Sequence, residues 1–187
     1  MSIQEILKLE YVLIPVLKSP IFSASYFAII GIASFPKIIC DSVAVSNFNI
    51  LLKSDKTGKI SLINRIIIQV ILILMIAILV NLFLLFQITR VFPLQYQPNL
   101  WAIIPFTLFA TFSSSRRMFL DILRASGEIA SRKATSIEII AFIPILVTNF
   151  FLLSEINLIQ WSYLVALASL LGLLITFMKV KKYAIIL

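Results

Sequence analysis

The sequence predicts an all-α integral membrane protein with about five transmembrane helices. Of its 187 residues, 61% are hydrophobic and only 13% are charged, whereas soluble domains are nearer half apolar and a quarter charged. The segment 66–88 carries no charge and can extend roughly 34 Å, enough to cross a hydrocarbon core. Basic and uncharged connections also alternate along the chain, as the positive-inside rule requires of correctly counted spans.

The predicted membrane domain covers residues 20–182, between an outer or interfacial segment, 1–19, and the end of a cytoplasmic tail, 183–187. The first segment has no uncharged core followed by a cleavage site, so it is not predicted to be a signal peptide. It either lies along the interface or follows a helix that the chain lacks, and the second interpretation is favoured. The predicted spans are 22–48, 66–88, 100–125, 137–153 and 161–178.

The charges outside the spans predict the topology. Three connections are basic, and the two between them carry only Arg90 and Glu155. We therefore expect a multi-pass protein of the cytoplasmic (inner) membrane with its C-terminus in the cytoplasm. The net charge of +8 then reflects topology, and no nucleic-acid partner is predicted. The basic residues are Lys53, Lys56, Lys59 and Arg65, then Arg124, Arg132 and Lys133, and finally Lys179, Lys181 and Lys182.

The composition weighs against an enzyme. The chain has no histidine and a single cysteine, Cys40. This removes His/Cys zinc sites, Ser-His-Asp and Cys-His catalytic groups, and an intrachain disulfide. The four glycines are isolated, so there is no glycine-rich phosphate loop. We expect no catalytic residue, no metal and no cofactor.

Charges occur inside the first predicted span. Lys37 and Asp41 are four residues apart and follow Pro36. On one continuous helix they share a face with Ser34, and both avoid lipid if that face looks into a bundle or cavity. Alternatively, the helix ends near Pro36 and the two charges lie among cytoplasmic headgroups. The sequence supports these two interpretations about equally.

The span 100–125 carries a second set of polar residues. Asp121 lies between Arg117 and Arg124, so it can pair with either guanidinium while the other stays free. An arginine fork with spare donors suits a phosphate or pyrophosphate group. Arginines that reach up to the headgroups are the alternative. This explains Arg124 well, Arg116 and Arg117 less well, and Asp121 poorly. The residues on one face are Ser113, Ser114, Arg117, Asp121 and Arg124, with Arg116 rotated by about 100°.

Prolines and tryptophans mark further features of the spans. Pro36, Pro105 and Pro144 interrupt predicted spans, which favours bent helices. Trp101 and Trp161 lie at the outer ends of two spans, and we expect them to be interfacial anchors.

Three passages between residues 20 and 182 carry a resemblance to a known family. They are "SASYFAIIGIASFPKIICDSVAVSNFNILLKSDKTGK", "LILMIAILVNLFLLFQITRVFPLQYQPNLWAIIPF" and "DILRASGEIASRKATSIEIIAFIPILV". Together they resemble the C-terminal half of a polysaccharide (O-antigen, Wzx-type) flippase of the multidrug/oligosaccharidyl-lipid/polysaccharide exporter superfamily. The first resembles the family's eighth helix and its basic exit, and the second resembles the ninth helix and the entry to the tenth. The third resembles the passage into the eleventh helix, through Leu123, Ala125 and Gly127.

The resemblance implies a fold and a function. The family has two similar lobes around a central cavity, so this chain would be one incomplete lobe. Its expected function is to flip lipid-linked oligosaccharide across the cytoplasmic membrane in surface polysaccharide and lipopolysaccharide biosynthesis, by alternating access. The expected partners are membrane lipid, a polyprenyl-pyrophosphate-linked oligosaccharide, and a missing N-terminal lobe supplied by a separate chain or by a second copy.

The resemblance also implies roles for five residues. Arg116, Arg117 and Lys37 would hold the pyrophosphate of the lipid-linked sugar. Asp121 and Asp41 would tune the charge of these cations or take part in ion coupling.

Other functions stay open at this point. One alternative is another exporter of the same superfamily, and a further one is a small membrane assembly or scaffold protein. A membrane enzyme such as a sugar polymerase is disfavoured, because its catalytic groups need large outer loops, and the predicted outer loops are only about ten and six residues long.

Overall fold

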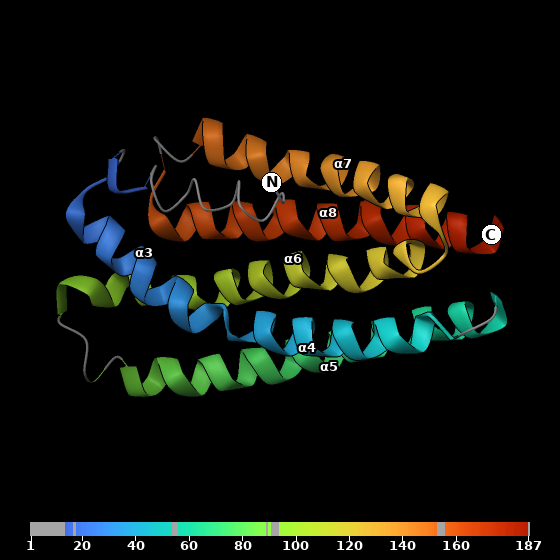
Figure 1. Ribbon diagram of the computed structural model, residues 1–187. Helices are drawn as coiled ribbons and strands as arrows, with labels where there is room; N and C mark the ends of the chain where they lie inside the picture. Colours follow the sequence, from blue (N-terminus) through green and yellow to red (C-terminus); the bar gives the residue numbers. More distant parts are fainter. Residues whose placement is uncertain are drawn as a thin grey trace.

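The computed structural model describes residues 14–16, 18–53, 56–88, 90, 94–152 and 156–186, and within them every regular element is a helix. The helices form an elongated bundle (Figure 1). The predicted all-helical class is therefore confirmed, while most of segment 1–19 lies outside the described residues. The elements are α3 (Pro20–Ala33), α4 (Phe35–Leu51), α5 (Lys56–Ile88), the 3-10 helix η1 (Leu94–Ala102), α6 (Ile103–Arg124), α7 (Glu128–Leu152) and α8 (Leu158–Ile186).

Three segments in the described part of the chain are long and apolar enough to cross a membrane. They are Pro20–Leu51, Ser61–Gln87 and Leu158–Tyr183. Ser61–Gln87 has a mean hydropathy of 3.0 and contains most of the predicted span 66–88. The exposed side chains of α5 and α8 include many large aliphatic and aromatic groups, which suits contact with lipid. By length and composition, the chain is a membrane protein.

The predicted span 22–48 consists of two helices, because α3 ends before Ser34 and α4 begins after it. Pro36 lies in the first turn of α4. Proline has no N–H, and its ring clashes with the carbonyl group four residues earlier, which accounts for the break. One helix therefore does end near Pro36, and a second helix, which carries Lys37 and Asp41, continues the path to Leu51. The placement of these two charges among headgroups stays a prediction.

The central helix of the bundle is α6, which packs against α3, α4, α5, α7 and α8. The predicted span 100–125 begins in η1 and becomes α-helical at Ile103. Pro105 lies in the first turn of α6. N–H groups of the first turn have no acceptor within the α-helix, so the missing N–H of proline costs no hydrogen bond there. It therefore does not interrupt the helix as expected, whereas Pro144 does lie inside α7.

The last two helices extend beyond their predicted spans. α7 begins at Glu128, well before residue 137, and α8 runs from Leu158 to Ile186. The turn between α6 and α7 contains Gly127, whose φ of 110° is a conformation that glycine adopts freely. Hydropathy predicts only the apolar part of a helix. The helix itself continues beyond that part through charged residues.

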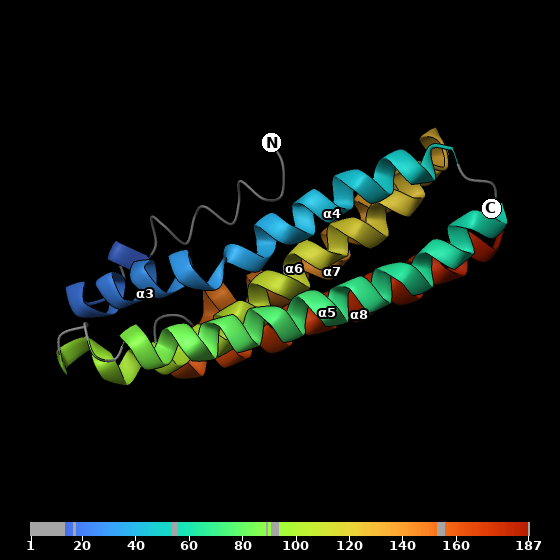
Figure 2. The same cartoon turned by 90° about the horizontal axis from the view of Figure 1, so that it is seen from below.

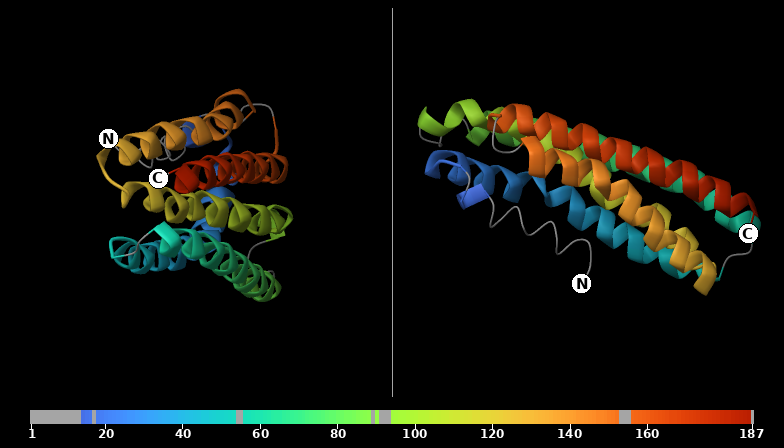
Figure 3. Two further views of the ribbon diagram at one scale, coloured as in Figure 1. Left: turned by 90° about the vertical axis from the view of Figure 1, so that its right-hand side faces the viewer. Right: turned by 90° about the horizontal axis from the view of Figure 1, so that it is seen from above.

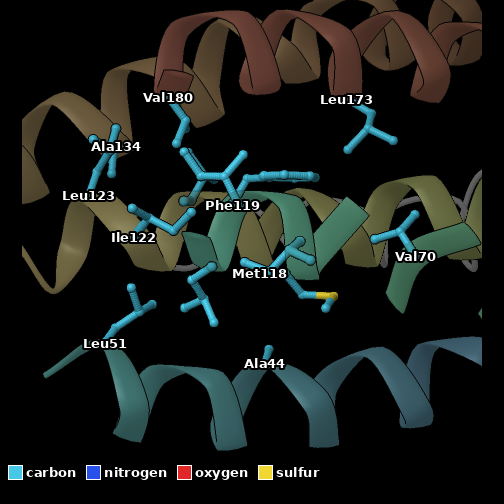
Figure 4. Packing of buried hydrophobic residues seen from close by; sticks show 14 of the residues in the cluster. Ala44, Leu51, Val70, Met118, Phe119, Ile122, Leu123, Ala134, Leu173 and Val180 are labelled. Carbon is cyan, nitrogen blue, oxygen red and sulfur yellow. The ribbon is translucent and has the colours of Figure 1, made fainter. Parts of the chain in front are cut away.

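Two hydrophobic clusters hold the helices together. One gathers side chains of α4, α5, α6, α7 and α8, including Met118 and Phe119 (Figure 4). The other contains Trp161, whose ring centre lies 5.4 Å from that of Tyr26 and 5.5 Å from that of Phe106. Because Trp161 is completely buried, the expectation that it is an interfacial anchor is wrong. Trp101 is 59% exposed, and its anchoring role stays a prediction.

Basic residues gather at one end of the bundle. The α4–α5 and α6–α7 connections lie at the same end as the C-terminus (Figures 1 and 3). Nζ of Lys133 lies 4.6 Å from the centre of the Tyr183 ring, which ties the start of α7 to the end of α8. In the described part of the chain, these two connections, the start of α7 and the last turns of α8 contain Lys53, Arg124, Arg132, Lys133, Lys179, Lys181 and Lys182.

Candidate functional site

Three helices bring five charged side chains together in one ion-pair network. Nη1 of Arg117 lies 3.4 Å from Oδ1 of Asp41, and Nε of Arg117 lies 3.9 Å from Oδ2 of Asp121. Arg124 lies 2.9 Å from Asp121 and 2.8 Å from Glu138. The network consists of Asp41 on α4, Arg117, Asp121 and Arg124 on α6, and Glu138 on α7.

The middle of the network is Asp121, whose side chain is only 10% exposed. It contacts both arginines, as their spacing on the helix predicts. The expectation that one guanidinium stays free is wrong, because Arg117 also reaches Asp41 and Arg124 also reaches Glu138. Contacts between helices that are distant in sequence supply these additional partners.

The first span contributes Asp41 to the network but not Lys37. Asp41 points to Arg117 of α6, with its side chain 34% exposed. Lys37 is exposed, and no ion pair of Lys37 is found among the described residues. The two residues do lie on one helix as predicted, yet the partner of Asp41 comes from the neighbouring helix.

Arg124 makes the two shortest contacts of the network. It joins carboxylates of α6 and α7, and the expectation that it lies at the headgroups stays a prediction. Its partner Glu138 was not among the candidate site residues. The available signal was a carboxylate inside a predicted apolar span, where an ionisable residue points to a partner or a function.

Arg116 lies elsewhere, between α6, α7 and α8. It is 8% exposed, and its Nη1 donates to the carbonyl oxygen of Ala141 at 3.1 Å. Its Cζ lies 5.9 Å from the centre of the Phe142 ring. The structure therefore separates Arg116 from Arg117, with which the sequence analysis grouped it, because a rotation of about 100° sends adjacent side chains to different neighbours.

Gly172 on α8 provides the space that Arg116 occupies. A Cβ atom at this position would overlap the carbonyl oxygen of Ala141 and lie 3.2 Å from Nη1 of Arg116. A residue without a side chain is therefore needed where α8 approaches α7 and the guanidinium.

A pocket of about 260 Å³ lies beside the network, between α4 and α6. It is partly open to the surface, which is the access that a ligand would need. Arg117 is the natural contact for such a ligand, because it is 42% exposed and its two ion-pair distances are the longest in the network. The lining residues are Val45, Phe48, Asn49, Arg117, Asp121 and Arg124.

The network carries no net positive charge. It contains three carboxylates and two guanidinium groups, so an anion entering the pocket must compete with a carboxylate for Arg117. Pairing reduces the cost of keeping these charges in a partly dry site. The arrangement can therefore exchange one ion pair for another, which a single fixed pair cannot do.

Comparison with protein-family models, with curated proteins and with solved structures finds no match to the chain.

Proposed function

We propose that the chain is one lobe, or part of one lobe, of a membrane exporter that flips lipid-linked oligosaccharide across the cytoplasmic membrane. The observation that carries the proposal is the ion-pair network beside a pocket in an otherwise apolar helical bundle. Ionisable residues inside a membrane are costly, and they commonly mark substrate or ion pathways.

The proposed substrate contact is Arg117. A phosphate or pyrophosphate group entering the pocket would replace Asp41 on its guanidinium, and the planar donors of arginine suit this exchange. Asp121 would keep Arg117 oriented during the exchange. Exposed Lys37, one turn before Asp41, would supply a second positive charge. Arg116 is left out of the pocket, because it is buried against Ala141.

The proposal includes five spans, formed by α3 with α4 and by α5, α6, α7 and α8. α6 has 22 residues and α7 has 25, so each can extend across roughly 30 Å of hydrocarbon. The basic end of the bundle, with the C-terminus, would then face the cytoplasm.

The first test is the Arg117→Ala variant in cells whose surface polysaccharide export depends on this chain. We expect export to be lost while the amount of protein in the membrane is unchanged. The matched control is Arg132→Ala, because Arg132 forms an exposed ion pair with Glu128 on α7. Normal export by Arg117→Ala would remove this residue from the substrate path.

A membrane scaffold is the second candidate, because every member of the network has a partner of opposite charge. In a scaffold, these pairs would only hold α4, α6 and α7 together. Arg117→Ala would then lower the amount of folded protein and leave export normal per molecule. Measuring export against membrane protein content separates the two functions. For an exporter of another substrate, Arg117→Ala would lower the export of that substrate per molecule of membrane protein.

A further inference from the structure

A single ion pair joins α4 to α6 in the described part of the chain. It connects Asp41 of α4 to Arg117 of α6. The other contacts between these helices are weaker in direction. Ala44 packs in one hydrophobic cluster with side chains of α6, and Sγ of Cys40 lies 3.9 Å from Oγ of Ser115. The ion pair is therefore the contact between α4 and α6 on which a charged ligand can act.

The geometry of this pair suits opening. Its length of 3.4 Å exceeds the roughly 2.7–2.9 Å of strong charge-assisted hydrogen bonds, whereas the two contacts of Arg124 are 2.9 and 2.8 Å long. Arg117 and Asp41 are also 42% and 34% exposed, and ion pairs with such access to solvent contribute little to stability. An anion can therefore replace Asp41 on Arg117 more readily than it can replace the partners of Arg124.

The break between α3 and α4 can act as a hinge. α3 ends at Ala33, α4 begins at Phe35, and the two helices follow one another along one edge of the bundle (Figure 2). Tyr26 holds α3 in place, because its ring centre lies 5.6 Å from that of Phe106 on α6. A few residues at the ends of elements commonly absorb a change of direction. Ser34 thus separates a helix fixed by aromatic packing from one that can turn.

The opposite side of α4 has a contact of its own. Nδ2 of Asn47 donates to Oε1 of Gln69 on α5 at 2.8 Å. Asn47 is two residues from both Val45 and Asn49, which line the pocket. A rotation of about 200° separates it from each of them, so Asn47 lies on the side of α4 away from the pocket. α4 can therefore keep its contact with α5 while its pocket side moves away from α6.

Asp41 has a second partner within reach. Lys37 lies one turn earlier on α4 and is exposed, and no ion pair of Lys37 is found among the described residues. Side chains four residues apart on a helix are neighbours. Displaced from Arg117, Asp41 can pair with Lys37 on its own helix. The ammonium group of lysine has three donors, so Lys37 can hold Asp41 and still contact an anion in the pocket.

The size of the pocket favours a movement of α4. Its volume of about 260 Å³ is below the roughly 300–1,000 Å³ of sites that enclose a drug-sized ligand. A phosphate group is much smaller than such a ligand, but a phosphate that carries a sugar is not. The closed pocket therefore suits the charged group alone, and the attached sugar needs additional space between α4 and α6.

We propose that the Asp41–Arg117 ion pair is a latch that a bound anion opens. Without the anion, the latch holds α4 on α6. An anion that takes Arg117 releases Asp41 to Lys37, and α4 then turns away from α6 at Ser34 and widens the pocket. The proposal rests on the anion contact of Arg117 given under Proposed function, and adds the movement that this contact starts.

Alkylation of Cys40 by N-ethylmaleimide in detergent measures the opening. Cys40 is the single cysteine of the chain and is completely buried beside α6, so it should react faster when α4 turns away. Loss of a partly exposed ion pair changes a population by up to roughly fivefold, and we expect this acceleration in Asp41→Asn. Inorganic pyrophosphate should accelerate alkylation of the unmodified chain similarly. Arg117→Ala should react fast with or without pyrophosphate.

Two controls show that the effect is specific. Glu128→Gln removes an exposed ion pair on α7, so it should react slowly and still respond to pyrophosphate. Asp41→Glu keeps the carboxylate and should also react slowly. Fast alkylation of Glu128→Gln would attribute the effect to general loosening of the bundle and overturn the latch, as would equally slow alkylation of Asp41→Asn and the unmodified chain.

The outcomes also separate this proposal from the proposed function. A bound ligand raises the Tm of the protein that binds it, so the Tm reports binding of pyrophosphate independently. If pyrophosphate raises the Tm but leaves the alkylation of Cys40 unchanged, the latch is overturned and the anion contact stands. If pyrophosphate changes neither quantity, the anion contact of Arg117 is contradicted, and the latch with it.

A disulfide between α4 and α6 tests whether export needs the movement. Ser115→Cys places a second thiol beside Cys40, where the present contact is 3.9 Å long. Oxidation of cells that carry this variant should stop export, and a reductant should restore it. The matched control is Ser115→Cys in a Cys40→Ala chain, which cannot form the disulfide. Normal export by chains that are joined through this disulfide would overturn the proposal.

Discussion

Burial, rather than distance, should decide which ion pair stabilises the protein. The shortest ion pair among the described residues joins Arg132 to Glu128 at 2.6 Å, with both side chains about four-fifths exposed (81% and 78%). Asp121 is 10% exposed and lies 2.9 Å from Arg124. Exposed pairs contribute little, whereas removing one partner of a fully buried pair costs roughly 3–5 kcal/mol.

The expected magnitudes follow from the exposures. Arg124 and Arg117 are 30% and 42% exposed, and each keeps a second carboxylate when Asp121 is removed. We therefore expect Asp121→Asn to cost about half of the fully buried value, about 2 kcal/mol. Glu128→Gln should cost less than about 0.5 kcal/mol.

Thermal unfolding of the purified protein in one detergent measures both variants. A loss of about 2 kcal/mol corresponds to a decrease in Tm of roughly 4–8 °C for a chain of this length. Glu128→Gln should shift the Tm by no more than about 2 °C. An equal or larger decrease for Glu128→Gln would refute the reasoning, because short distance would then matter more than burial.

Two further pairs of substitutions follow from the packing. Gly172→Ala should lower the free energy of unfolding by about 1–3 kcal/mol, since its methyl group overlaps the carbonyl oxygen of Ala141. Gly31→Ala, measured in detergent as its control, should be neutral or stabilise slightly. Trp161→Phe should cost about 1–2 kcal/mol, because Nε1 of Trp161 donates to Asn149 at 3.2 Å inside the aromatic cluster. Trp101→Phe should have little effect, since Trp101 is exposed; equal losses at the two tryptophans would contradict the burial of Trp161.

The sequence alone predicted the helical class and the position of the most apolar helix, because both depend on composition and local hydropathy. It also predicted that Asp121 lies between two arginines, because helical spacing fixes that arrangement. The contacts of Arg117 with Asp41 and of Arg124 with Glu138 were missed. The paired residues are 76 and 14 positions apart in the sequence and lie on different helices. How whole helices pack therefore determines these contacts. The length of the apolar spans likewise could not show that Tyr26 and Phe106 cover Trp161.

Arg116 and Arg117 show how far local pattern can determine function. They are adjacent in the sequence, but one lies beside a pocket and the other is buried. The difference follows from the rotation of about 100° between adjacent positions of α6. This rotation turns Arg116 toward the carbonyl oxygen of Ala141 on α7 and Arg117 toward Asp41 on α4. Arg117 is therefore the arginine of this pair that lines the pocket, and the helices that pack around α6 decide which of two adjacent arginines a ligand can contact.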